Sequence, residues 1–291
     1  MNIIKKISLL VFLIIVLTGC DIENNDMEDI NIYTTTYPLN YLISSLYKDN
    51  GKVFSIYPTG VDINNYKISN RKLDEYSESD LFVFNSLDKD RDYAVKMINN
   101  NSKLKVIDVA TGMDYENKIE ELWLNPYNYL MMAENIREGL NEYIKNPYLA
   151  EQVDKNYKEL DYNISKIDAD LTETIENATY KTIIVDNDLF KYLEKYGLKV
   201  ISLENDAKLS LNTKEEVIKL IKLRQIRYIY RTSKNNNNFI NELIRDYQIQ
   251  TIDINTMYSI DGGITNTNDD YLTIMKKNIN LIKGELYKTN N

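Results

Sequence analysis

The sequence predicts an α/β protein of two lobes, each built on a mainly parallel sheet, joined by one long backbone helix. Short apolar segments alternate with segments of helical periodicity before residue 146 and again after residue 180, which is the pattern of successive βαβ units. Between these parts, residues 147–178 contain no glycine or proline after Pro147. The chain has 291 residues, of which 43% are hydrophobic, enough for two ordinary cores.

The first lobe is expected to span residues 30–146. Its clearest strand signal is the apolar run around Phe82 and Val83, bounded by polar residues, as in a buried parallel strand. Its helices show apolar residues three or four positions apart, such as Leu39, Leu42 and Leu46. The expected strands are 31–35, 52–57, 80–85 and 103–109, and the expected helices are 38–47, 69–79 and 126–144.

The segment 147–179 is expected to be the linking helix. Pro147 suits the first turn of a helix. The predicted length of roughly 30 residues corresponds to about 45 Å. A coiled coil is the alternative, but the stripe covers only about three heptads and is flanked by α/β patterns, so a helix crossing between two lobes is favoured. The apolar stripe consists of Val153, Tyr157, Leu160, Ile164, Ile167, Leu171 and Ile175.

The second lobe is expected over residues 180–291, where the α/β alternation returns. A helix ending at Tyr196 is predicted from Gly197, a typical C-terminal cap, and another is predicted to begin near Thr213. The expected strands are 181–185, 199–203, 226–230 and 250–254, and the further helices are 213–223, one ending at Tyr247, and 270–286.

The first 19 residues have the features of a secretory signal: Lys5 and Lys6 precede a short apolar run that ends at Leu17. The run is too short to span a bilayer comfortably. Leu17 is followed by Thr, Gly and Cys20, the only cysteine, and this sequence resembles a bacterial lipobox. The resemblance implies cleavage before Cys20 and attachment of diacylglycerol to its sulfur. A plain signal anchor or a buried cysteine is the alternative. Residues 20–29 are then expected to be a flexible tether.

Composition excludes several kinds of chemistry. The chain contains no histidine, which rules out imidazole ligands and histidine-based catalytic triads. With Cys20 lipidated, no free thiol remains. Loss of Lys5 and Lys6 with the signal changes the formal charge from −9 to −11, so no nucleic-acid partner is expected. A glycine-rich phosphate loop is also absent, and we expect no enzymatic activity.

Several motifs, in order and with compatible spacing over residues 30–288, resemble those of the zinc/manganese-type metal-binding lipoproteins of ABC transporters. Residues 58–66 resemble the family's Pro-x-Gly-x-Asp-x-His-x-Tyr loop, and 122–126 resemble its His-x-Trp-Leu-Asp-Pro segment. Further similar segments are 33–39, 79–85, 132–136, 192–198 and 270–275. The resemblance implies two lobes bridged by a helix, with a metal ion held in the cleft between them.

The family's ligand positions, carried over onto this chain, hold no imidazole. The first histidine falls on Asn64 and the second, two residues before Trp123, falls on Glu121. The third position, histidine or glutamate in the family, falls on Asp186. The fourth, an aspartate, falls on Asn255, with Asp253 as the nearby alternative. The resemblance therefore implies a site of two carboxylates and two carboxamides.

An all-oxygen site of this kind favours harder ions such as Mn²⁺ over Zn²⁺, because zinc prefers nitrogen and sulfur donors. Two alternatives remain open. The four residues can be ordinary polar cleft residues with no bound metal. Arg231, where the family more often carries an acidic residue, can also supply the missing positive charge beside Glu121 or Asp186.

The leading functional hypothesis is a lipid-anchored, monomeric solute-binding protein on the outer face of the cell membrane. It would deliver a divalent cation to an ABC permease and its ATPase. One alternative is a degenerate family member that binds no metal and acts as an adhesin-like surface protein. The other is a protein of the same architecture that binds an organic ligand, such as a metal chelate.

Overall fold

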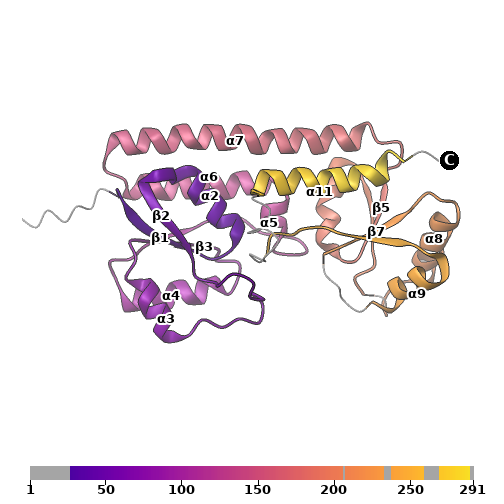
Figure 1. Ribbon diagram of the computed structural model, residues 1–291, viewed down its shortest axis with the longest axis horizontal. Coiled ribbons are helices and arrows are strands. Elements are labelled where there is room, and N and C mark those ends of the chain that lie inside the picture. Colours follow the sequence, from indigo (N-terminus) through magenta and orange to yellow (C-terminus); the bar gives the residue numbers. More distant parts are fainter. Residues whose placement is uncertain (1–26, 206, 233–236, 259–268, 289–291) are drawn as a thin grey trace, which may run out of the picture.

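The computed structural model describes residues 27–205, 207–232, 237–258 and 269–288. They form two α/β lobes that lie side by side beneath one long helix, α7 (Figure 1). The signal segment 1–19 and Cys20 lie outside the described residues. In the described part of the chain, no helix is both long enough and apolar enough to cross a lipid bilayer.

The N-terminal lobe is built on the parallel sheet β2-β1-β3-β4. All four residues of the central strand β3 are buried, as expected for a strand covered on both faces. The strands are β1 (Ile30–Thr34), β2 (Gly51–Ser55), β3 (Leu81–Phe84) and β4 (Lys105–Asp108). The helices are α2 (Tyr37–Tyr47), η1 (Lys48–Asn50), α3 (Asn70–Ser77), α4 (Asp90–Asn100), α5 (Glu121–Leu124) and α6 (Pro126–Tyr143).

The C-terminal lobe repeats the same strand order in the parallel sheet β6-β5-β7-β8. Gly197 ends η2 in the left-handed conformation, with φ 96°, which a glycine adopts without steric cost. The strands are β5 (Thr182–Val185), β6 (Lys199–Ser202), β7 (Tyr228–Arg231) and β8 (Gln250–Asp253). The helices are η2 (Asp188–Tyr196), α8 (Leu211–Lys222), α9 (Asn238–Tyr247) and α11 (Tyr271–Leu286).

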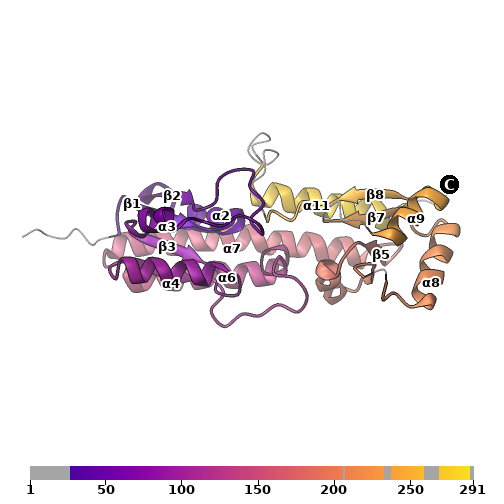
Figure 2. The same ribbon diagram turned by 90° about the horizontal axis from the view of Figure 1, so that it is seen from below.

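Helix α7 (Pro147–Glu176) is the predicted linking helix, and it runs along both lobes. It packs against α2 and α6 of the N-terminal lobe and against α11 and η2 of the C-terminal lobe. Figure 2 shows α6 and α11 lying along its length from a second direction. Apart from half-buried Tyr157, the predicted stripe is buried; its buried members are Val153, Leu160, Ile164, Ile167, Leu171 and Ile175.

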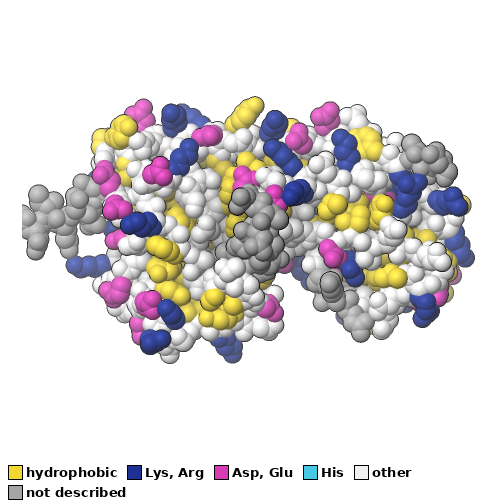
Figure 3. All heavy atoms as spheres, in the orientation of Figure 1, with side chains coloured by type: hydrophobic (Ala, Val, Ile, Leu, Met, Phe, Trp, Pro, Cys, Tyr) yellow, Lys and Arg dark blue, Asp and Glu magenta, His cyan; other side chains and the backbone are white. Residues whose placement is uncertain are grey.

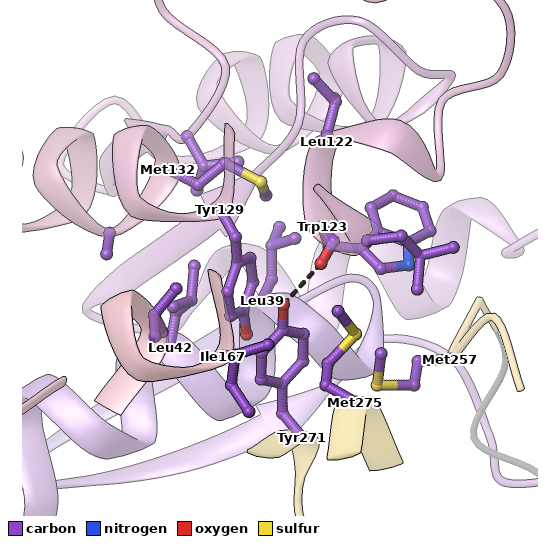
Figure 4. Packing of buried hydrophobic residues seen from close by; sticks show 14 of the residues in the cluster. Leu39, Leu42, Leu122, Trp123, Tyr129, Met132, Ile167, Met257, Tyr271 and Met275 are labelled. Atoms are coloured by element: carbon purple, nitrogen blue, oxygen red, sulfur yellow. Dashed lines mark hydrogen bonds between the residues drawn. The ribbon is translucent and has the colours of Figure 1, made fainter. Parts of the chain in front are cut away.

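One continuous hydrophobic core joins the two lobes through α7. Tyr271, the first residue of α11, is fully buried, and its ring stacks on Tyr129 of α6 with 4.0 Å between centroids. Its hydroxyl donates a hydrogen bond to the carbonyl of Trp123 at 2.6 Å. Figure 4 shows this contact beside Leu39 of α2 and Ile167 of α7. The C-terminal helix is therefore anchored in the N-terminal lobe.

The structure confirms the two parallel sheets and the long helix, and it differs from the sequence expectation in several details, among them the short helices η1 and α5, which were not predicted. Helix α4 was not predicted; its buried positions Tyr93, Ala94 and Met97 form only a narrow apolar stripe. The η2 segment is a 3₁₀ helix. Met27, assigned to the flexible tether, is instead buried in the core, because its apolar side chain packs with the N-terminal lobe.

Candidate functional site

A cavity of about 1060 Å³ lies between the lobes. It is lined by residues that follow the strands of both sheets, as expected for α/β folds, in which ligands bind beyond the carboxyl ends of parallel strands where the strand order reverses. Figure 3 shows the outer surface indented between the lobes, on the side away from α7. The charged residues that line the cavity are Asp62, Asp88, Glu120, Asp186, Glu204, Lys118 and Arg231.

Asn64 lines the cavity from the loop between β2 and α3. Asp62 organises this loop, because its carboxylate accepts hydrogen bonds from the Asn64 backbone amide at 3.0 Å and from the Asn65 side chain at 2.5 Å. The Asn64 side chain is thereby left to face the opposite lobe, and its Oδ1 accepts a hydrogen bond at 3.1 Å from the hydroxyl of Tyr258, which follows β8.

The Tyr258 hydroxyl also lies 3.3 Å from Oδ2 of Asp88, in the loop between β3 and α4 of the N-terminal lobe. Its ring stacks on Trp123, the only tryptophan, with 5.8 Å between centroids. Trp123 is buried, and its Nε1 donates to the Thr256 carbonyl at 2.7 Å. Burial raises the pKa of Tyr258, and Asp88 and Glu120 raise it further, so the hydroxyl remains protonated at neutral pH.

Asp186 lines the same cavity from the end of β5, and 8% of its surface is exposed. Its Oδ2 accepts a hydrogen bond from the Thr232 amide at 3.0 Å, and its Oδ1 accepts one from the Asn187 side chain at 2.9 Å. These contacts hold the Asp186 carboxylate between the carboxyl ends of β5 and β7. The structure therefore brings Asp186 and Asn64 to one cavity from opposite lobes.

Two cations lie in the cavity wall, and each is paired. Arg231 at the end of β7 forms an ion pair with Asp253 of β8 at 3.0 Å. Lys118 of the N-terminal lobe pairs with Glu204 of the C-terminal lobe, and the other oxygen of Glu204 accepts a hydrogen bond from the Asp188 amide at 2.9 Å. The carboxylates of Asp253 and Glu204 are thus already paired with protein cations of the cavity wall.

The other two predicted ligands, Glu121 and Asn255, are not among the cavity-lining residues. The buried Glu121 carboxylate accepts backbone hydrogen bonds from Asn117 at 3.2 Å and Glu116 at 3.3 Å, which hold the preceding loop. The Asn255 side chain accepts a hydrogen bond from the Met257 amide at 2.9 Å, which shapes the turn after β8. Both side chains have a structural role in this conformation.

Glu120 lines the cavity next to Glu121 and was not singled out from the sequence. Burial raises the pKa of its carboxyl, and the neighbouring carboxylates of Asp88 and Glu121 raise it further, partly offset by Lys118. Such a group gains stabilisation from a bound cation. The sequence shows two adjacent glutamates before the tryptophan motif, and only the turn of α5 decides which of them lines the cavity.

The donor set of the cavity consists of oxygen atoms. Within the described ranges, no group of three or more Asp, Glu, His or Cys side chains is close enough to hold a metal ion. The cavity-lining oxygens of Asn64, Asp88 and Glu120 belong to one lobe and those of Asp186 belong to the other. A cation held by all of them would require the lobes to approach each other.

Comparison with known proteins identifies the family. Residues 32–284 match the family model described as ZnuA, zinc-uptake complex component A, periplasmic. The chain belongs to this family. Members of the ZnuA family with solved structures share its two-lobed fold, and the predicted family resemblance is confirmed.

The ZnuA-family relatives are distant in sequence. The zinc-binding lipoprotein AdcA of Streptococcus pneumoniae is 24% identical over 307 aligned positions, covering 96% of this chain and 60% of AdcA. The chain thus spans about 60% of the length of this relative. The structure of the metal-dependent lipoprotein YcdH from Bacillus subtilis gives a TM-score of 0.72 at 20% identity, covering 89% of this chain and 100% of YcdH.

A third likeness is to the laminin-binding protein Lbp of Streptococcus pyogenes, with a TM-score of 0.67 at 17% identity. It covers 89% of this chain and 99% of the Lbp chain. At this level of identity the likeness establishes a shared fold.

Proposed function

We propose that this ZnuA-family protein is the solute-binding subunit of an ABC importer and captures a divalent metal ion in the cavity between its lobes. The observation that carries the proposal is the cavity itself, which lies at the carboxyl ends of both sheets and is lined by Asn64 of one lobe and Asp186 of the other. Both residues occupy positions where the family resemblance implies metal ligands. The family match and the zinc-binding relatives support capture of a metal as cargo.

The proposed ligands are Asp186, Asn64 and Glu120, with Asp88 beside them. Glu120 replaces Glu121 in this proposal, because Glu121 already accepts hydrogen bonds from backbone amides and Glu120 lines the cavity. Glu121 and Asn255 remain sequence predictions that mutagenesis can test. Since oxygen donors suit hard cations, we propose that this donor set shifts selectivity from Zn²⁺ toward Mn²⁺.

The remaining parts of the proposal concern location and partners. We propose that lipidated Cys20 anchors a monomer to the outer face of the membrane, where it delivers its cargo to an ABC permease and ATPase. The support is the lipobox-like sequence that ends at Cys20 and the similarity of the chain to AdcA, a zinc-binding lipoprotein. Fractionation tests the anchor: Cys20→Ala protein should leave the membrane fraction, and its retention there after a salt wash would contradict it.

The test of the function is elemental analysis of protein purified without chelator, followed by calorimetric titration with Mn²⁺, Zn²⁺ and Ca²⁺. We expect one bound ion per chain. Asn64→His should raise the affinity for Zn²⁺ more than that for Mn²⁺, because it adds one nitrogen donor at the family position. Tight binding of Zn²⁺ in preference to Mn²⁺ by the unmodified chain would contradict the selectivity claim.

A second candidate function is the binding of an organic ligand, such as a metal chelate. The observation that favours it is the size of the cavity, about 1060 Å³, together with Arg231 and Lys118 in its wall. A bare ion fills only a small part of that volume, whereas an anionic chelate would also contact the two cations. Metal binding only in the presence of a small-molecule chelator, detected by native mass spectrometry, would favour this candidate. An adhesin-like role rests on shared fold alone.

A further inference from the structure

The segment that follows β8 connects the two lobes across one wall of the cavity. Asn278 of α11 accepts a hydrogen bond from the Asn255 amide at 3.2 Å, which ties the start of this segment to the C-terminal lobe. The Thr256 carbonyl of this segment then accepts a hydrogen bond from the indole N–H of Trp123 at 2.7 Å. The Tyr258 ring stacks on the same indole, 5.8 Å away between centroids. The segment therefore presents Tyr258 to the N-terminal lobe in a fixed position.

The Tyr258 hydroxyl makes contact with two side-chain oxygens of the N-terminal lobe. The distances are 3.1 Å to Asn64 Oδ1 and 3.3 Å to Asp88 Oδ2. A phenol hydrogen can be donated to one of these oxygens at a time, and it points at a lone pair that a cation would otherwise use. A cation bound at either oxygen draws electron density from it and repels that hydrogen, so the hydrogen bond and the bound cation weaken each other.

We propose that Tyr258 is a latch. Its hydroxyl is bonded to oxygens of the N-terminal half of the cargo site, and an incoming cation competes with it for Asn64 and Asp88. This inference rests on the proposed function, since the cation is the cargo proposed above. The stacked indole keeps the phenol within reach of both oxygens, so the latch can close again once the cation leaves. Tyr258 is thus a positioning residue that lowers the apparent affinity for cargo.

The first test is calorimetric titration of the full chain with Mn²⁺, comparing Tyr258→Phe with the unmodified protein. Because the substitution removes the hydrogen bond that competes with the cation, it should tighten the Mn²⁺ dissociation constant by about tenfold. The matched control is Tyr143→Phe, which removes a hydroxyl that donates to the Val106 carbonyl at 3.0 Å; neither residue lines the cavity. This control should bind as the unmodified protein does.

Two results of the titration would overturn the latch. Weaker binding by Tyr258→Phe would show that the phenol oxygen is itself a ligand. Unchanged binding would show that the hydroxyl has only a structural role.

The second test needs no cargo, and it separates failure of the latch from failure of the proposed function. The Tyr66 amide bonds to the Asp62 carbonyl at 2.8 Å in the loop that carries Asn64. If the latch holds this loop, hydrogen exchange of residues 62–66 in cargo-free Tyr258→Phe should be several-fold faster than in the unmodified protein and in Tyr143→Phe. Equal exchange rates in all three proteins would overturn the latch, whether or not Mn²⁺ binds.

Discussion

At the scale of single residues, buried carboxyl groups of the N-terminal lobe are in very different environments. Glu121 is buried but accepts several hydrogen bonds from its own loop. Asp90, the first residue of α4, has 1% of its surface exposed, and burial raises its pKa to about 7, partly offset by the hydroxyls of Thr35 and Tyr57. Asp90 is therefore a proton-binding group beside Thr35, the residue that follows β1.

The raised pKa of Asp90 makes stability depend on pH. Between pH 3.8 and about 7 the folded protein holds a proton that the unfolded chain has released, so stability falls as pH rises through this window and is constant above it. Asp90→Asn should therefore raise the free energy of unfolding at pH 8 by an amount on the order of a few kcal/mol, and the gain should vanish near pH 4.

Chemical denaturation at a series of pH values measures this effect. The matched control is Asp92→Asn, which neutralises an exposed carboxylate on the same helix. A pH-independent difference between Asp90→Asn and the unmodified protein would contradict the assignment.

At the residue scale, the sequence predicted two of the residues that line the cavity. Asn64 and Asp186 were predicted because the family's ligand positions, carried over onto this chain, fall on them. Glu120 was missed because the family motif places the ligand two residues before Trp123, at Glu121, and only the folded structure shows which of the two adjacent glutamates lines the cavity. Tyr258 was missed because its contacts with Asn64 and Asp88 join positions separated by 194 and 170 residues, and no local pattern encodes such contacts.

At the scale of elements, local signals fixed the positions of the main helices. Three of the four prolines lie in the first turn of a helix, at Pro38, Pro126 and Pro147. The preceding Asn125 and Asn146 cap α6 and α7 by accepting hydrogen bonds from backbone amides at 3.1 and 2.9 Å. Helix α4 lacks such a start signal, because its N-cap position is Lys89, which makes no side-chain capping bond. This explains why the sequence did not reveal it.

Truncating a side chain in the apolar stripe of α7 should measurably lower the free energy of unfolding. Ile167 is fully buried in the core shared by the two lobes. Ile167→Ala should lower the free energy of unfolding by about 2–5 kcal/mol, because it removes buried methyl groups and leaves a cavity. Tyr162→Ala on the same helix is the control, since 70% of Tyr162 is exposed and its loss should change stability by only about 0.5 kcal/mol.

Thermal or chemical denaturation of both α7 variants provides the comparison. Equal stability of Ile167→Ala and Tyr162→Ala would show that the stripe does not carry the packing between α7 and the lobes.

At the scale of the whole molecule, one helix and one continuous core hold two lobes of equal topology. Tyr271 of α11 is buried against Tyr129 and Trp123 of the N-terminal lobe, so the lobes share packed side chains in addition to α7. The cavity lies on the opposite side from this helix-covered face. A protein built in this way can bring the two walls of the cavity closer together while the helical layer on the opposite side stays in place.

The central claim is that carboxylates from both lobes hold one divalent cation between them. Its most direct test is a single calorimetric series with Mn²⁺ on three variants of the full chain: Asp186→Asn in the C-terminal lobe, Glu120→Gln in the N-terminal lobe, and Glu194→Gln as an exposed control in the C-terminal lobe. The account predicts one ion per chain, loss of binding in the first two variants, and unchanged binding in the third. Full binding by Asp186→Asn or by Glu120→Gln, or no heat of binding in the unmodified protein, would contradict it.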